Sequence, residues 1–217
     1  MREVALGQTS YVHGASDVPL IGETIGGYFD RVCAAEPDRL ALIVRHQGVR
    51  WTYGELKQRV DDFAAGLLSL GLQPGERVGI WAPNCWEWTV TQFATAKAGL
   101  ILVNINPAYR RSEVEYALNK VGCRALITAI SHKTSDYIGM LRDLAPELAE
   151  AKPGELSSAA LPDLRFLVTL GEARQPGCLA FSDVLDRGAA AGGEELARIS
   201  APLQFDEPIN IQFTSGT

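Results

Sequence analysis

The stretch RVGIWAPNCWEWTVTQFATAKAGLILV, residues 77–103, decides the class of fold. Its two ends, residues 77–82 and 100–103, are short apolar runs of the kind that form buried strands. The segment between them predicts a helix that ends before Gly99. A strand, a helix and a second strand form the unit from which parallel sheets are assembled, so this stretch predicts an α/β fold.

The same alternation continues toward the N-terminus. Residues 40–44 and 49–51 are expected to be strands, and the next helix begins at a capping box, T-x-x-E, formed by Thr52 and Glu55. In a capping box the hydroxyl and the carboxylate each accept a hydrogen bond from a backbone N–H that the helix leaves free. An apolar stripe then runs to Gly71, which suits a left-handed C-terminal cap.

Toward the C-terminus the alternation is also present. Strands are expected at residues 125–128, 164–170 and 209–213, and helices at residues 137–144 and 181–191, the second of these capped by Ser182. Another helix is predicted to open at a second capping box, formed by Ser112 and Glu115. Residues 149–162 have the composition of a surface linker within a domain. The expected fold class is α/β, with mixed, largely parallel sheets flanked by helices.

The composition is that of an ordinary globular chain of 217 residues, 47% hydrophobic and 21% charged. Residues 1–23 are expected to form an irregular N-terminal arm, and residues 24–217 the domain. The net charge of −6 excludes the broad basic surface that nucleic acid would need. A bound anion must therefore be held by local backbone and hydroxyl groups.

The sequence also indicates where the protein works. It has no run near the roughly 18 apolar residues of a membrane-spanning helix, and no apolar segment typical of a secretory signal at its N-terminus. The spacing of the four cysteines offers neither a CxxC metal motif nor a dense disulfide framework: Cys33, Cys85, Cys123 and Cys178. We therefore expect a cytoplasmic protein with reduced, mostly buried thiols and no integral membrane segment.

The most informative residues for function stand last, where an expected strand runs into Thr214, Ser215, Gly216 and Thr217. Glycine lets backbone N–H groups converge on an anion, and three hydroxyls can donate hydrogen bonds to phosphate oxygens. The same residue types also suit an ordinary turn. Both interpretations stay open on these residues alone.

Other candidates for chemistry are weaker. Gly22 and Gly27 have the spacing of a P-loop, but Tyr28 and Phe29 stand where Lys and Ser or Thr are required, which excludes that motif. The three histidines are too far apart to predict a zinc site: His13, His46 and His132. No catalytic residue and no metal ligand is therefore assigned.

Three further features are interpreted as structural. A stacking platform could be formed by three tryptophans, but burial fits their size better: Trp81, Trp86 and Trp88. Lys97 is expected to extend its ammonium group to the surface past apolar neighbours. Arg110 and Arg111 suit a solvated turn more than an anion clamp.

Three segments, in order, resemble the core motifs of the adenylate-forming (AMP-binding) superfamily of acyl-CoA synthetases, luciferases and peptide-synthetase adenylation domains. WTYGEL (51–56) resembles the first motif, and AKAG (96–99) with NINPAY (104–109) resembles the second. QFTSGT (212–217) resembles the opening of the glycine- and threonine-rich phosphate loop. The resemblance covers residues 24–217 and implies an incomplete N-terminal domain of the adenylate-forming, acyl-CoA synthetase-like fold.

The resemblance also implies roles. Thr214, Ser215, Gly216 and Thr217 would begin the ATP phosphate loop, whereas the family's catalytic lysine and magnesium-associated glutamate lie beyond this sequence. The pattern N-x-N-P-x-Y is similar to that of fatty-acyl-CoA synthetases. We therefore expect the N-terminal part of a fatty-acid–CoA ligase that uses ATP, Mg²⁺ and CoA, and we expect the 217-residue chain alone to be inactive.

The chemistry that the resemblance implies starts from a carboxylate, which is a poor electrophile. Its attack on the α-phosphate of ATP gives an acyl-adenylate and pyrophosphate, and the thiol of CoA then displaces AMP. The first step needs a triphosphate held in line with its charge neutralised. Two alternatives stay open: a non-catalytic α/β module for binding or dimerisation, and a ligase for aryl or short-chain acids. The expected partners are small-molecule substrates, with a homodimer as a further hypothesis.

Overall fold

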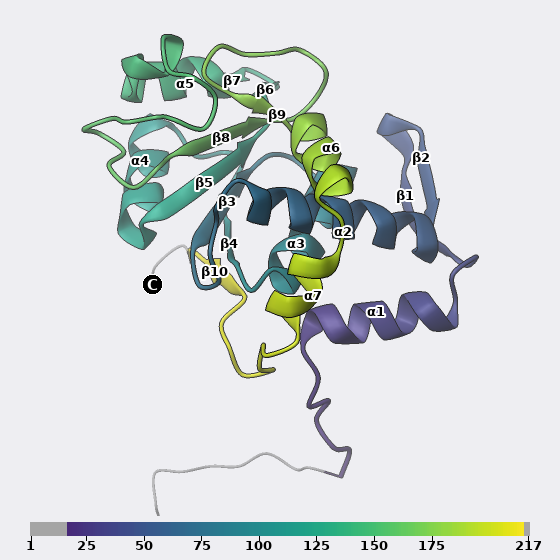
Figure 1. Cartoon of the computed structure of the whole chain (residues 1–217). Coiled ribbons are helices and arrows are strands. Elements are labelled where there is room, and N and C mark those ends of the chain that lie inside the picture. Colours follow the sequence, from purple (N-terminus) through teal and green to yellow (C-terminus); the bar gives the residue numbers. More distant parts are fainter. Residues whose placement is uncertain (1–16, 215–217) are drawn as a thin grey trace, which may run out of the picture.

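The computed structural model describes residues 17–214 (Figure 1). The helices in this range are α1 (Ile25–Ala35), α2 (Tyr53–Ser69), α3 (Trp86–Lys97), α4 (Arg111–Val121), α5 (Tyr137–Leu144), α6 (Phe181–Ala191) and α7 (Glu194–Ser200). The strands are β1 (Leu40–Val44), β2 (Val49–Thr52), β3 (Arg77–Trp81), β4 (Ile101–Asn104), β5 (Cys123–Thr128), β6 (Ser131–His132), β7 (Ser135–Asp136), β8 (Phe166–Thr169), β9 (Leu179–Ala180) and β10 (Asn210–Gln212). Two short 3₁₀ turns, Arg45–Gln47 and Pro146–Ala149, complete the set.

A six-stranded sheet in the order β10-β4-β3-β5-β8-β9 organises the fold. All of its neighbouring strands pair in parallel. The chain enters at β3, in the middle, and adds strands on both sides. This confirms the predicted α/β class with largely parallel strands. The remaining strands form two antiparallel pairs, β1 with β2 and β6 with β7.

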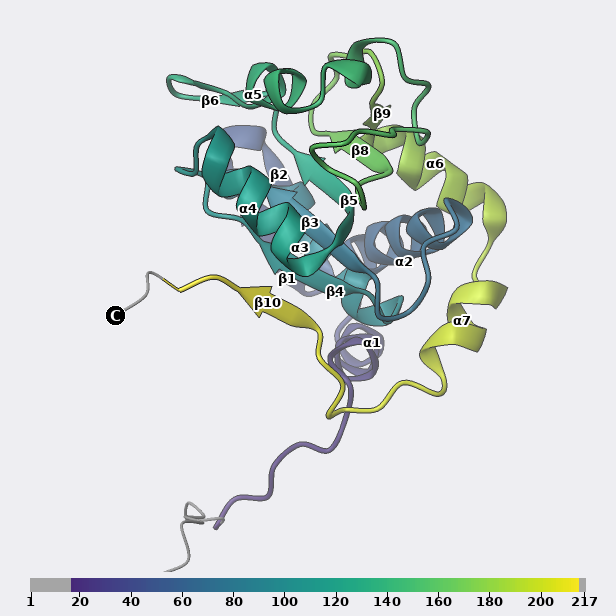
Figure 2. The ribbon, with the colours of Figure 1, turned by 90° about the vertical axis from the view of Figure 1, so that its left-hand side faces the viewer.

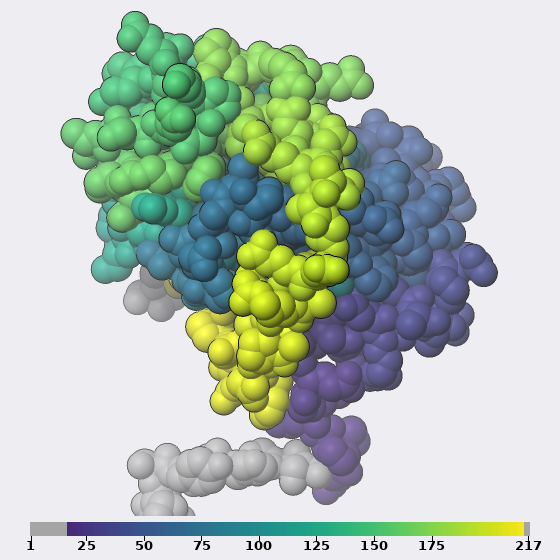
Figure 3. All heavy atoms as spheres, viewed as in Figure 1, coloured from purple at the N-terminus to yellow at the C-terminus, as the bar shows by residue number. Residues whose placement is uncertain are grey.

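Helices cover both faces of the sheet. Crossover connections between parallel strands are right-handed. The chain moves in one direction across the sheet from β3 to β4 and in the other from β4 to β5, so α3 and α4 lie on opposite faces. Figures 1 and 2 show α4 and α5 on one face and α2, α3 and α6 on the other. The chain from α6 through α7 then crosses α2 and runs down beside α1 (Figure 3).

The packing of α6 on α2 is unusually close. A Cβ atom added to Gly66 would lie 2.0 Å from the Val184 carbonyl oxygen, so the two backbones nearly touch. The rings of Phe63 and Phe181 stack beside this crossing, with centroids 3.9 Å apart and planes at 13°. Glycine is therefore required here for its lack of a side chain rather than for its backbone freedom.

The helix starts confirm one predicted cap and correct two. Thr52 and Glu55 form the expected capping box, because each side chain accepts a hydrogen bond from the other residue's N–H, at 3.2 and 2.8 Å. The box predicted at Ser112 and Glu115 is wrong. The N-cap of helix α4 lies two residues earlier, at Arg110, whose N–H donates to Glu113 at 2.8 Å.

Helix α6 spans the predicted residues, but Ser182 does not cap it. The Asp183 carboxylate accepts the Ala180 N–H at 3.1 Å. Arg174 donates two hydrogen bonds to the same carboxylate, and this pairing lowers the pKa of Asp183. Asp183, the third residue of the helix, therefore caps it in place of the predicted Ser182.

Three parts of the chain differ from the expectations or were not predicted: α7, residues 149–162 and the shortest strands. Helix α7 was not predicted, since only Leu196 and Ile199 of its residues are buried. The segment read as a surface linker, 149–162, buries Leu156 and Leu161 and so belongs partly to the core. The short strands β6, β7 and β9 carry too few residues to show a period.

The thiols are free, as expected. Cys33, Cys123 and Cys178 are buried and Cys85 is half-buried. Burial raises the pKa of Cys85 and Cys123 to about 12 and that of Cys178 to about 11. These groups therefore remain protonated at neutral pH.

The described part of the N-terminal segment lies outside the layers. Residues 17–24 precede α1 and project away from the sheet (Figure 1). Val18 and Leu20 in this segment are 80% and 95% exposed. The division of the chain into an arm and a domain stays a prediction. No helix within residues 17–214 is both long and apolar enough to cross a membrane.

Candidate functional site

The strands β3, β4 and β10 end side by side at one edge of the sheet. Since α3 and α4 leave this edge toward opposite faces, the loops after β3 and β4 diverge. In open parallel sheets, such a divergence at the carboxyl ends of the strands leaves a crevice in which ligands bind. The candidate site lies at this edge.

The crevice contains a hollow of about 290 Å³, which we call the amide hollow. Its described lining combines side-chain amides with aromatic rings: Asn84, Asn104, Asn106 and Gln212, with Trp88, Tyr109 and Phe213. None of the described residues that line it carries a charge. The hollow therefore suits an uncharged, hydrogen-bonding part of a ligand more than a phosphate.

Asn104 contributes an open acceptor. It is the last residue of β4 and lies in register with Gln212 of β10. Its Oδ1 atom is buried and has no hydrogen-bond partner among residues 17–214. Buried polar atoms normally have partners, so this oxygen is available to a donor on a ligand or a water molecule.

The floor of the amide hollow is a turn that starts at Asn106. The Asn106 carbonyl accepts the Tyr109 N–H at 3.0 Å, and its side-chain oxygen accepts the Ala108 N–H at 2.9 Å. Pro107 occupies the second position, where its fixed φ favours a turn. The turn directs the chain from β4 toward α4 and brings Tyr109 to the site.

A second hollow, of about 270 Å³, adjoins the first, and we call it the threonine hollow. Tyr109 and Phe213 line both hollows, and the threonine hollow is completed by Ser112, Glu113, Tyr116 and Thr214. Thr214 is exposed and follows β10 after one intervening residue, Phe213. The structure thus places the first residue of the proposed phosphate loop beside the turn after β4.

The other residues of the proposed loop, Ser215, Gly216 and Thr217, lie outside the described residues. Their assignment to the ATP phosphate loop stays a prediction. Sequence reasoning named the residues around Asn104 and Asn106 only through a family motif and did not assign them to a site. Polar residues directly after apolar strands were the signal that could have found them, since those positions meet at one sheet edge.

Lys97 is not where it was expected. Its side chain is 5% exposed, so the prediction that it reaches the surface is wrong. Its ammonium group donates to Asp30 at 2.6 Å and to Asp61. Lys57 pairs with the same two carboxylates. The cluster joins α1, α2 and α3, far from the carboxyl edge of the sheet.

The remaining candidates take structural places. Trp81 is fully buried, as expected, while Trp88 is half-buried in the wall of the amide hollow. Arg110 and Arg111 are exposed at the start of α4, where Arg110 donates to Ser135 at 3.0 Å.

The structure offers no metal site in the part that it describes. Of the histidines, His46 is exposed, His132 is half-buried and His13 lies outside residues 17–214. No group of three His, Cys, Asp or Glu side chains within that range could hold a metal ion. Because proteins commonly hold Mg²⁺ with only one or two carboxylates together with substrate phosphates, no described residue is assigned to the expected Mg²⁺.

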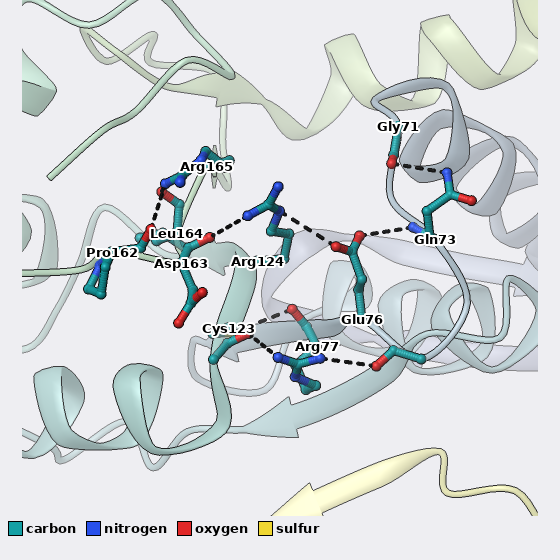
Figure 4. A network of polar contacts seen from close by, with 12 residues as sticks. Gly71, Gln73, Glu76, Arg77, Cys123, Arg124, Pro162, Asp163, Leu164 and Arg165 are labelled. Atoms are coloured by element: carbon teal, nitrogen blue, oxygen red, sulfur yellow. Dashed lines mark hydrogen bonds and ion pairs between the residues drawn. The ribbon is translucent and has the colours of Figure 1, made fainter.

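At the opposite, amino edge of the sheet, a network of polar contacts joins neighbouring segments of the chain (Figure 4). The Arg77 guanidinium donates hydrogen bonds to the carbonyls of Val121, Gly122 and Gly75 at 2.6, 2.8 and 3.3 Å. Gly122 has a φ of 61°, which ends α4 and turns its last carbonyls toward the arginine. Arg124 pairs with Glu76 at 3.6 Å in the same network. This edge contributes stability, and the carboxyl edge is left open for a ligand.

We expect Arg77→Met to lower the free energy of unfolding by about 2 kcal/mol, because carbonyls at the end of α4 lose a charged donor. Urea denaturation measures the change. The matched control is Arg124→Met, which removes a partly exposed pair and is expected to change the stability by less than about 1 kcal/mol. Equal effects of the two substitutions would contradict the assigned role of Arg77.

Taken together, the parallel sheet and its open carboxyl edge define a ligand-binding α/β domain. The AMP-binding enzyme family matches residues 29–217, which is most of the chain. The chain belongs to the AMP-binding enzyme family.

Curated relatives agree with this assignment. The chain is 45% identical to the bovine (Bos taurus) medium-chain acyl-CoA ligase ACSF2, mitochondrial, over 98% of its own length and 34% of that protein. It is 37% identical to the putative acyl-CoA synthetase YngI of Bacillus subtilis (strain 168), over 91% of its own length and 36% of that protein. The chain thus spans about a third of the length of these relatives.

Solved structures share the fold. The inhibitor-bound N-terminal domain of FACL13 from Mycobacterium tuberculosis superimposes with a TM-score of 0.68 at 21% identity, over 89% of this chain and 42% of that one. The anthranilate CoA ligase AuaEII in complex with anthranoyl-AMP gives a TM-score of 0.64 at 24% identity, over 80% and 30% of the two chains. The predicted resemblance to the adenylate-forming fold is confirmed.

Proposed function

We propose that this chain is the N-terminal part of an ATP-dependent acyl-CoA ligase that activates a fatty acid as an acyl-adenylate and transfers it to CoA. The observation that carries the proposal is the 45% identity to a medium-chain acyl-CoA ligase over nearly the whole chain. The position of Thr214, at the open carboxyl edge beside the turn after β4, supports it.

In this proposal the residues of the chain bind and orient ATP. The hydroxyl of Thr214 donates to a phosphate oxygen at the mouth of the threonine hollow, which supplies a neutral donor in an acidic protein. Asn104 and its amide neighbours hold an uncharged part of a substrate in the amide hollow. Magnesium would neutralise phosphate charge when bound.

Pyrophosphate exchange tests the proposal. The full-length protein is expected to exchange labelled pyrophosphate into ATP only when a fatty acid is present, and to release AMP when CoA is added. Acids of graded length and shape then separate fatty from aryl or short-chain substrates. Release of ADP in place of AMP would place the enzyme in another class of ligase. The 217-residue chain alone is expected to give no exchange above a blank.

We expect Thr214→Val in the full-length protein to lower kcat/KM for ATP by about tenfold, the effect of losing one hydrogen bond to a charged phosphate. The matched control is Thr134→Val, since Thr134 is also exposed but lies between β6 and β7. That control should retain the wild-type value. An unchanged kcat/KM in the Thr214 variant would remove this residue from the ATP site.

We also propose that the protein works in the cytoplasm, although the ACSF2 relatives are named mitochondrial. Cell fractionation with an antibody against the chain tests it. Homodimerisation is a separate hypothesis, which gel filtration decides.

A further inference from the structure

Two buried aromatic side chains lie directly beneath the site. Trp81 ends β3, and Tyr137 is the first residue of α5. Both are fully buried, and their rings stack with centroids 4.1 Å apart and planes at 22°. The pair comes from two elements, β3 and α5, and both rings hydrogen-bond to the loop after β4.

The polar atoms of both rings are aimed at consecutive carbonyls of that loop. The Trp81 Nε1–H donates to the Asn106 carbonyl at 3.2 Å, and the Tyr137 hydroxyl donates to the Pro107 carbonyl at 2.7 Å. Burial raises the pKa of Tyr137, so its hydroxyl remains a donor. Buried indole and phenol groups need partners, and here the partners are a loop that has no regular structure of its own.

The held loop reaches the start of the proposed phosphate loop. The Asn106 carbonyl that accepts from Trp81 also accepts the Tyr109 N–H, which closes the turn. Tyr109 and Phe213 then share the walls of both hollows. Phe213 immediately precedes Thr214, so the rings of Tyr109 and Phe213 form the surface beside which the proposed phosphate loop begins.

We propose that Trp81 and Tyr137 are positioning residues that set the affinity for ATP by holding the Asn106–Tyr109 turn against the start of the phosphate loop. This inference rests on the proposed function. Neither ring reaches the hollows itself, because both are buried beneath the turn. Their effect on a ligand therefore passes through the two carbonyls.

Tyr137→Phe is the decisive variant, since it removes one hydroxyl and keeps the ring that stacks on Trp81. In the full-length protein we expect KM for ATP to rise about fivefold, the equivalent of one hydrogen bond. The values of kcat and of KM for the acid and for CoA should stay within about twofold of wild type. Trp81→Phe should act in the same direction, and the double variant should fall short of the product of the two effects because both act on one turn.

Thr95→Val is the matched control. Thr95 is fully buried in α3, and its hydroxyl donates to the Thr91 carbonyl at 2.8 Å. The substitution removes the same kind of bond away from the turn, so a general loss of stability would appear in both variants. We expect KM for ATP to be unchanged in the control.

Amide hydrogen exchange on the same full-length proteins gives a readout that needs no activity. The Tyr109 amide should exchange at least about tenfold faster in the Tyr137→Phe protein than in wild type, and not in the Thr95→Val protein. An unchanged exchange rate and an unchanged KM for ATP in an active protein would overturn the inference. Absence of pyrophosphate exchange in wild type would instead overturn the proposed function and the role in ATP affinity, while amide exchange would still decide whether the rings hold the turn.

Discussion

Replacing Lys97 by methionine is expected to lower the free energy of unfolding by about 3 kcal/mol, near the low end of the range for removing one partner of a buried ion pair. Methionine keeps most of the buried aliphatic stem but removes the ammonium group. Asp30 and Asp61 would then face each other with Lys57 as their remaining partner. These carboxylates are 39% and 28% exposed, so water screens part of the loss and keeps the effect from being larger.

The control for this prediction is Lys57→Met. Lys57 contacts the same two carboxylates, but its side chain is 34% exposed against 5% for Lys97. We expect the control to lose less than about 1 kcal/mol in urea denaturation. If the Lys97 variant were as stable as wild type, the cluster would have no role in holding α1 against α2 and α3.

The second large effect is expected for Gly188→Ala, which should lower the free energy of unfolding by about 3 kcal/mol or more, as overpacking against backbone does. A Cβ atom at Gly188 would lie 1.7 Å from the Asp62 carbonyl oxygen and 2.6 Å from the Gly66 nitrogen. Neither is the end of a flexible side chain. Helices α2 and α6 would have to separate, and the Phe63–Phe181 stack would separate with them.

Gly193→Ala is a suitable control because nothing lies within 4 Å of the added Cβ and the residue has a φ of −92°. Its expected effect is within about 0.5 kcal/mol of wild type. Thermal unfolding of the wild-type, Gly188→Ala and Gly193→Ala proteins, followed by circular dichroism, measures the effect of each substitution. A Gly188→Ala protein with wild-type stability would mean that α2 and α6 pack less closely than described.

The periodic parts of the fold could be predicted from the sequence, and the reason is local. Strand β1 and helix α5 match their expected bounds because apolar spacing defines them, and Pro146 ends the helical pattern of α5. Helix α7 is not predicted because seven residues, about two turns, with two buried side chains show no period.

Long-range features could not be predicted. The burial of Lys97 depends on Asp30 and Asp61, which are 67 and 36 residues away in the sequence. Nothing in the local pattern of a lysine between alanines shows that two carboxylates from other helices will meet it. An exposed position was therefore the physically reasonable expectation for a charge with no visible partner.

One part of the candidate site could be predicted from a local motif, and the other part depends on the order of the strands. The family motif drew attention to residues 212–217, of which the structure describes the first three and places Thr214 at the carboxyl edge. The amide hollow depends on β10 and β3 flanking β4 in the sheet. That order joins residues more than a hundred positions apart, such as Asn104 and Gln212, and it follows from the crossover connections and not from any local pattern.

The arginine network at the amino edge has a consequence for how such a protein can diverge. The arginine network lies at one end of the strands, and the residues that would meet a substrate lie at the other. Substitutions at Asn84 or Gln212, both exposed, can accumulate without disturbing the hydrogen bonds of Arg77. Relatives with one scaffold can therefore acquire new preferences by changing loop residues, with little selection pressure from folding on those positions.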